Sequence, residues 1–72
     1  MGLKIKEPLR VKQKVASRVS GKPTIRNMAD QLNMSTRTVT KIFKGRVIDW
    51  STASDVAKFI GEDVAAIASE VS

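Results

Sequence analysis

The chain has 72 residues and thirteen lysines and arginines against seven acids, which gives a net charge of +6 and a pI of about 10.2. It has no cysteine and no histidine, which excludes disulfides and the commonest zinc sites, and no apolar run approaches the roughly 18 residues of a membrane span. We therefore expect one small cytoplasmic domain without metal, cofactor or membrane partner. The lack of tyrosine, of a glycine-rich phosphate loop and of paired acids argues against an enzyme.

The basic charge is concentrated in the first part of the chain. Residues 1–46 hold twelve of the thirteen basic side chains and two acids, a charge of +10, whereas residues 47–72 sum to −4. Clustered basic charge is typical of proteins that bind a polyanion, although small proteins also need charge for solubility. The asymmetry favours a polyanion as partner of the basic part and leaves the acidic part free to contact something else.

The N-terminal residues 1–6 alternate apolar residues with lysines. Alternation can indicate a strand, but six residues cannot form a sheet alone, so the segment is interpreted as a basic N-terminal arm. A helix is predicted over residues 8–19, with Pro8 in its first turn, where the missing N–H costs nothing. Residues 20–23 end this helix. Its apolar face comprises Leu9, Val15, Ala16 and Val19, with Val11 at the edge.

Two short helices are predicted next. Thr24 is a typical N-cap for a helix over residues 25–32, and Ser35 caps another that runs to about Lys44. Asn33 tolerates the left-handed backbone of a tight turn. Because only about three residues separate the two helices, they must cross steeply. The residues expected to face inward are Met28, Ala29, Leu32, Met34, Val39, Ile42 and Phe43.

The outward face of the second of these helices follows from this packing. Helical geometry places five side chains on it, with Ser35 at the tip: Thr36, Arg37, Thr40, Lys41 and Lys44. The face has hydroxyls and cations but no acid and no large apolar residue.

The last part of the chain is predicted to form two further helices. Asp49 is a candidate N-cap for a helix over residues 50–60, in which Trp50 is expected to anchor the core. Gly61 ends it, and a last helix, apolar around much of its circumference, extends toward Val71. Such a helix either closes the core or meets a second subunit. The candidate dimer or partner contacts are Phe59, Val64, Ile67 and Val71.

Residues 25–44 resemble the helix-turn-helix signature of the Cro and lambda-repressor family. The alanine of that signature corresponds to Ala29, and its usual glycine is replaced by Asn33. Its apolar positions correspond to Met28, Leu32, Met34, Val39 and Ile42. The resemblance implies an all-α, lambda-repressor-like fold, a compact bundle of about five short helices. It would form a single domain over residues 1–72 with the helix-turn-helix at residues 24–44.

The resemblance also implies that the second helix of the motif enters the major groove of DNA. The expected base contacts are Ser35, Thr36, Arg37, Thr40 and Lys41. The expected phosphate contacts are Thr24, Arg26, Lys44 and Arg46. Among them Arg37 is the strongest candidate, because a guanidinium can bind O6 and N7 of guanine together.

The sequence is compatible with two functions. The first is a Cro-type transcriptional regulator of a phage genetic switch, which binds a double-stranded DNA operator in the bacterial cytoplasm, as a homodimer on two half-sites. The alternative is an antirepressor that keeps the fold but binds a phage repressor protein. The acidic, apolar C-terminal part motivates this second hypothesis.

Overall fold

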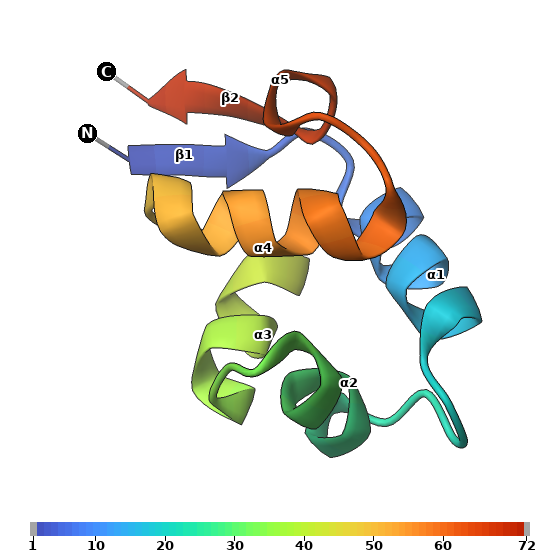
Figure 1. Cartoon of the computed structure of the whole chain (residues 1–72). Coiled ribbons are helices and arrows are strands. Elements are labelled where there is room, and N and C mark those ends of the chain that lie inside the picture. Colours follow the sequence, from blue (N-terminus) through green and yellow to red (C-terminus); the bar gives the residue numbers. More distant parts are fainter. Residues whose placement is uncertain (1, 72) are drawn as a thin grey trace.

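The computed structural model describes residues 2–71. Within this range the chain forms five helices and two strands. Figure 1 shows α4 between the two strands on one side and α2 and α3 on the other, with α1 packed beside it. In chain order the elements are β1 (Gly2–Ile5), α1 (Pro8–Arg18), α2 (Ile25–Leu32), α3 (Thr36–Phe43), α4 (Trp50–Ile60), α5 (Val64–Ile67) and β2 (Ala68–Val71).

Three helices begin where a side chain accepts a hydrogen bond from the first turn, as the sequence predicts. Thr24 accepts from the N–H of Asn27 at 3.1 Å, Ser35 accepts from Thr38 at 3.2 Å, and Asp49 accepts from Thr52 at 2.8 Å. Each of these bonds satisfies an N–H that has no partner inside its helix.

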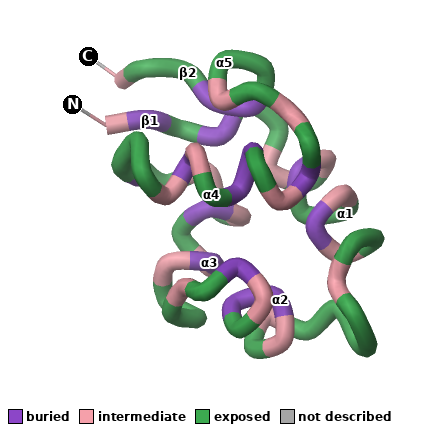
Figure 2. The backbone as a smooth tube through the Cα atoms, viewed as in Figure 1, coloured by how far each residue is buried: buried purple, intermediate pink, exposed green. Residues whose placement is uncertain are grey.

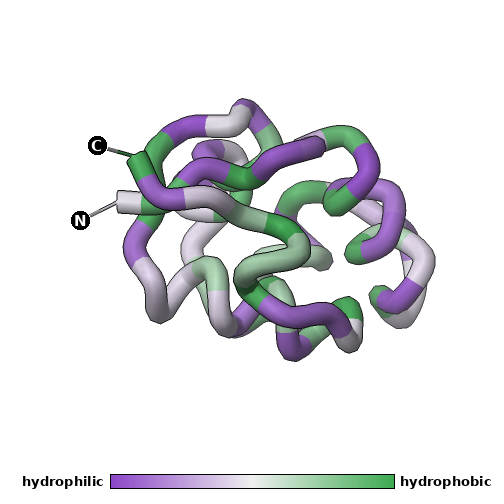
Figure 3. Tube along the Cα trace, turned by 90° about the horizontal axis from the view of Figure 1, so that it is seen from above, coloured by the Kyte–Doolittle hydropathy of each residue, from purple (hydrophilic) through white to green (hydrophobic). Residues whose placement is uncertain are grey.

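The expectation of an all-α fold is wrong in one respect, because the two ends of the described chain form an antiparallel sheet. Gly2 pairs with Val71 and Ile5 with Ala68, so residues 2–5 are a strand and not a free basic arm. The N-terminal alternation does mark a strand, whose partner lies more than sixty residues away. The last helix likewise ends at Ile67 and does not reach Val71. Seen from above, the two ends of the described chain lie on the same side of the molecule (Figure 3), in agreement with the pairing of Gly2 and Val71.

The apolar core receives buried residues from all seven elements (Figure 2). In α1 the buried residues are Val11 and Val15, whereas Leu9 is 74% exposed, which reverses the predicted places of Leu9 and Val11. These two residues lie about 200° apart around a helix, so orienting the helix with Val11 inward turns Leu9 to solvent.

Trp50 was expected to anchor the core but is 63% exposed. It occupies the first position of α4, directly after the N-cap Asp49. The buried face of α4 consists of smaller residues, which are Ala53, Val56, Ala57 and Ile60. Trp50 is therefore a surface residue.

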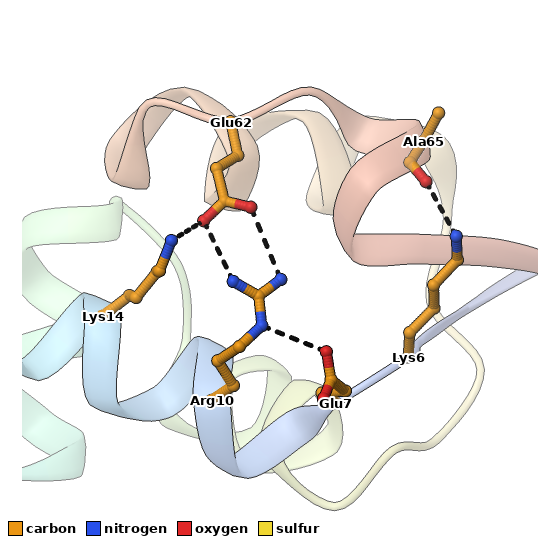
Figure 4. A network of polar contacts seen from close by, with 6 residues as sticks. All are labelled: Lys6, Glu7, Arg10, Lys14, Glu62 and Ala65. Carbon is orange, nitrogen blue, oxygen red and sulfur yellow. Dashed lines mark hydrogen bonds and ion pairs between the residues drawn. The ribbon is translucent and has the colours of Figure 1, made fainter.

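An ion-pair network joins α1 to the segment after α4 (Figure 4). Glu62 is paired with both Lys14 and Arg10, and Arg10 also donates to Glu7 at 3.1 Å. The hydrogen bond from Lys14 lowers the pKa of Glu62, and Arg10 lowers it further, against a partial burial that raises it.

We expect this network to make the stability of the domain depend on pH. Because folding lowers the pKa of Glu62 from its ordinary value of 4.5, its contribution is complete above that pH and is lost as the pH falls through the folded-state pKa. Urea unfolding of the wild type and of Glu62→Gln at neutral pH and below pH 4.5 measures the difference. The two proteins should converge in acid, and Glu70→Gln, at an exposed position, should keep the wild-type profile. A gap between wild type and Glu62→Gln that persists in acid would contradict this role.

Candidate nucleic-acid interface

A short turn at residues 33–35 sets the orientation of α3. Asn33 adopts the left-handed conformation (φ 59°), and the N–H of Met34 donates to the carbonyl of Ala29 at 2.9 Å. Both features close the end of α2 and direct the chain into Ser35, which caps α3. The two helices then share a packed interface whose buried residues are Met28, Ala29, Leu32, Val39 and Ile42.

The side chains predicted to face outward from α3 lie together in the structure. Thr36, Arg37 and Lys41 are exposed, and Thr40 is half-buried. With two further cations they line one shallow hollow of about 440 Å³; its lining residues are Thr36, Arg37, Thr40, Lys41, Lys44 and Arg46. Four of these six carry a positive charge and none is acidic. The hollow is thus an anion-attracting surface that also presents hydroxyl groups.

Two of the hydroxyls in the predicted base-contact set already have partners within the domain. The hydroxyl of Thr40 donates to the carbonyl of Thr36 at 2.9 Å, so toward a ligand it can only accept a hydrogen bond. The hydroxyl of Ser35 accepts from the N–H of Thr38 and lies 2.9 Å from the Thr38 hydroxyl. Ser35 therefore acts as the cap of α3, and Arg37 and Lys41 are the charged members of the predicted base-contact set.

The residues predicted to contact phosphates fall into two places. Lys44 and Arg46 lie at the end of α3 and line the same hollow as the base-contact set. Thr24 and Arg26 lie at the start of α2 and do not line it, although both are exposed. Nearby, the side-chain amide of Asn27 donates to the carbonyls of Ser20 and Lys22, which fixes the loop that leads into α2.

The cations of α3 are free of intramolecular acids. Within residues 2–71, the ion pairs engage only Arg10 and Lys14 among the basic residues. These two side chains do not line the hollow and are paired with Glu62. Within the described residues, the four cations of the hollow therefore form no ion pair with an acidic side chain.

Lys12 on α1 is a further cation near the end of α3, and it is not among the predicted contact residues. Its ammonium lies 6.0 Å from the ring centroid of Phe43, the last residue of α3, at the outer range of a cation–π contact. Pro8 packs against the turn after α3, where a Cβ on Gly45 would lie 3.3 Å from the proline ring. These contacts bring a cation of α1 beside the end of α3. Only the packing of α1 reveals this, because no local signal predicts it.

The C-terminal residues proposed as partner contacts are mostly used by the domain itself. Ile67 is fully buried, so its assignment as a partner contact is wrong. Phe59 and Val64 are partly buried against the core, and Val71 pairs with Gly2 in the sheet. Phe59 also lines a separate hollow with Gln31, Leu32, Asn33, Asp55 and Lys58.

Comparison of the chain with protein-family models, with curated proteins and with solved structures finds no match. The functional argument therefore rests on the geometry and charge of the domain. Within residues 2–71, the structure contains no helix of the length and apolarity needed to cross a membrane.

Proposed function

We propose that this protein is a sequence-specific DNA-binding regulator whose α3 enters the major groove of duplex DNA. One observation carries the proposal: the outward side chains of α3 and of the segment that follows it line one hollow with four cations, two threonines and no acid. The major groove is about 12 Å wide and accepts an α-helix, and its flanking phosphates favour unpaired cations. The turn at residues 33–35 and the caps at Thr24 and Ser35 support the same arrangement, because they fix where α3 begins as it packs on α2.

In this proposal the residues of the hollow have different tasks. Arg37, near the start of α3, reads guanine through its paired donors, and Lys41 one turn later reaches a guanine acceptor or a phosphate. Thr40 accepts a hydrogen bond from a base amino group, because its own proton is used within the helix. Lys44 and Arg46, at the far end, bind phosphates, which position the helix without reading sequence.

The resemblance of residues 25–44 to the Cro and lambda-repressor signature extends the proposal to a Cro-type switch regulator of a phage. The antirepressor alternative drew on the apolar C-terminal part. Because Ile67 lies in the core and Val71 in the sheet, those residues no longer favour it over DNA binding.

Replacing Arg37 with alanine tests the proposed readout. We expect affinity for a selected operator to fall by about 1–3 kcal/mol, roughly 5- to 150-fold, and the preference for guanine at the contacted position to disappear. Selection from a randomised duplex library followed by gel shift measures both quantities. Arg18→Ala is the matched control, because Arg18 is also exposed but lies at the end of α1, outside the hollow. If Arg37→Ala keeps both the affinity and the base preference, the assigned readout fails.

A further inference from the structure

The segment that follows α3 is held at both of its ends by backbone hydrogen bonds. At one end the N–H of Arg46 donates to the carbonyl of Lys41 at 3.0 Å. At the other end Leu3 and Ile48 exchange hydrogen bonds of 2.7 and 2.8 Å, and both of their side chains are buried. Arg46, which lines the hollow on α3, therefore lies between the end of that helix and a contact with β1.

β1 is in turn attached to the other end of the described chain (Figure 1). Because both backbone groups of Leu3 are bonded to Ile48, β2 pairs along the opposite edge of β1. Beyond the paired residues, the N–H of Lys6 donates to the carbonyl of Ile67 at 2.8 Å, and its ammonium donates to the carbonyl of Ala65 at 3.0 Å. The segment after α3 is thus connected through β1 to both α5 and β2.

Gly2 fits against this segment because it has no side chain. A Cβ at this position would collide with a methyl group of Val47 and would lie 3.7 Å from the carbonyl oxygen of Ile48. Val47 is β-branched, which restricts the rotation of its side chain, and it directly follows Arg46 in the chain. A larger residue in place of Gly2 therefore pushes Val47, and with it the backbone next to Arg46, away from β1.

The two cations that follow the outward face of α3 differ in what fixes them. Lys44 is the C-cap of α3, and its N–H donates to the carbonyl of Thr40 at 3.0 Å, so the helix itself sets its position. Arg46 lies beyond the helix and forms no ion pair within residues 2–71. The contact with β1 is therefore available to orient Arg46, and a guanidinium binds phosphate best when its fork is correctly oriented.

We propose that Gly2 is a positioning residue for Arg46. By leaving space for Val47, it lets β1 hold the segment after α3 so that the guanidinium of Arg46 meets the phosphate backbone. This inference rests on the proposed binding of DNA by α3. It adds that a residue outside the hollow sets one phosphate contact, and that the base contacts of Arg37 are independent of it. Gly2 itself touches no DNA.

Replacing Gly2 with alanine tests the inference on a duplex that the wild type selects from a randomised library. We expect the slope of log K against log salt to fall by about 0.9, the contribution of one phosphate. If the affinities at 1 M salt are equal, this is a loss of about 8-fold at 0.1 M salt. The preference for guanine should remain, because Arg37 is not displaced. Fluorescence anisotropy over a salt series measures the slope, and circular dichroism checks that each variant is folded.

Two further variants separate positioning from a general loss of stability. Val47→Ala removes the methyl group that the added Cβ meets, so the double variant Gly2→Ala, Val47→Ala should recover the wild-type slope. In an Arg46→Ala background, Gly2→Ala should lower the slope no further, because two changes that act through one contact are not additive. Ser69→Ala is the control, at an exposed position of β2, and should keep the wild-type slope.

The contact can also be followed without DNA. In the free protein, the backbone amide shifts of residues 46–48 should move in Gly2→Ala and return in the double variant. The inference alone is overturned if Gly2→Ala binds with the wild-type slope, if its loss persists in the Arg46→Ala background, if the double variant does not recover, or if Gly2→Ala is unfolded. A wild type that binds no duplex at low salt overturns the proposed function, and this inference with it.

Discussion

Replacing Ile42 with alanine is expected to destabilise the domain by about 2–5 kcal/mol. Ile42 is fully buried in α3, in the same core cluster as Met28 and Leu32 of α2, and its truncation leaves a cavity in that core. A domain of this length has a total stability of about 4–11 kcal/mol, so a single substitution removes a large share of it. DNA binding should weaken in parallel, because α3 is positioned only while it is packed.

Urea unfolding followed by circular dichroism measures this effect, and Leu9→Ala provides the comparison. That substitution removes the same kind of side chain at a position that is 74% exposed, so it should change stability by no more than about 0.5 kcal/mol. Equal losses in the two variants would mean that α3 does not pack as described.

Removing Lys44 and Arg46 together is expected to lower affinity for any duplex. Each neutralised phosphate contributes about 0.9 to the slope of log K against log salt, so the double alanine variant should lose about two units of slope. If the affinities at 1 M salt are equal, this corresponds to a loss of roughly 60-fold at 0.1 M salt. Base preference should remain, because phosphate contacts position the helix without reading sequence. Fluorescence anisotropy over a salt series measures the slope.

The double variant Arg18→Ala, Lys58→Ala controls for net charge. It removes the same two charges from exposed positions outside the hollow on α3. A specific role for Lys44 and Arg46 requires that this control keep most of the wild-type slope. Equal losses of slope would show that net charge alone attracts DNA, without a defined docking surface.

The parts of the fold that were predicted correctly are those set by local chemistry. Thr24, Ser35 and Asp49 cap helices as expected, because a hydroxyl or carboxylate that meets an unpaired N–H is decided within four residues. Asn33 and Gly61 end helices in the left-handed conformation for an equally local reason. The outward set of α3 follows from the same helical spacing, and the structure places it in one hollow.

The parts that were missed depend on contacts between distant segments. β1 finds its partner β2 at the other end of the chain, and neither segment has enough residues to specify a sheet alone. The orientation of α1 depends on which of Val11 and Leu9 meets α4, a choice that the helical pattern alone leaves open. Trp50 is exposed although Ala53, three residues later in α4, is fully buried, and the hydrophobicity of the tryptophan alone does not predict this tertiary position.

Backbone amide chemical shifts on addition of a duplex oligonucleotide test the central claim most directly. If α3 enters the major groove, the largest changes should fall on Thr36, Arg37, Thr40 and Lys41, with smaller ones at Lys44 and Arg46. The amides of residues 62–67, around the Glu62 network, should stay unchanged. Shifts that concentrate at residues 55–67 and leave α3 unaffected, or no shifts at low salt, would contradict DNA binding by this surface.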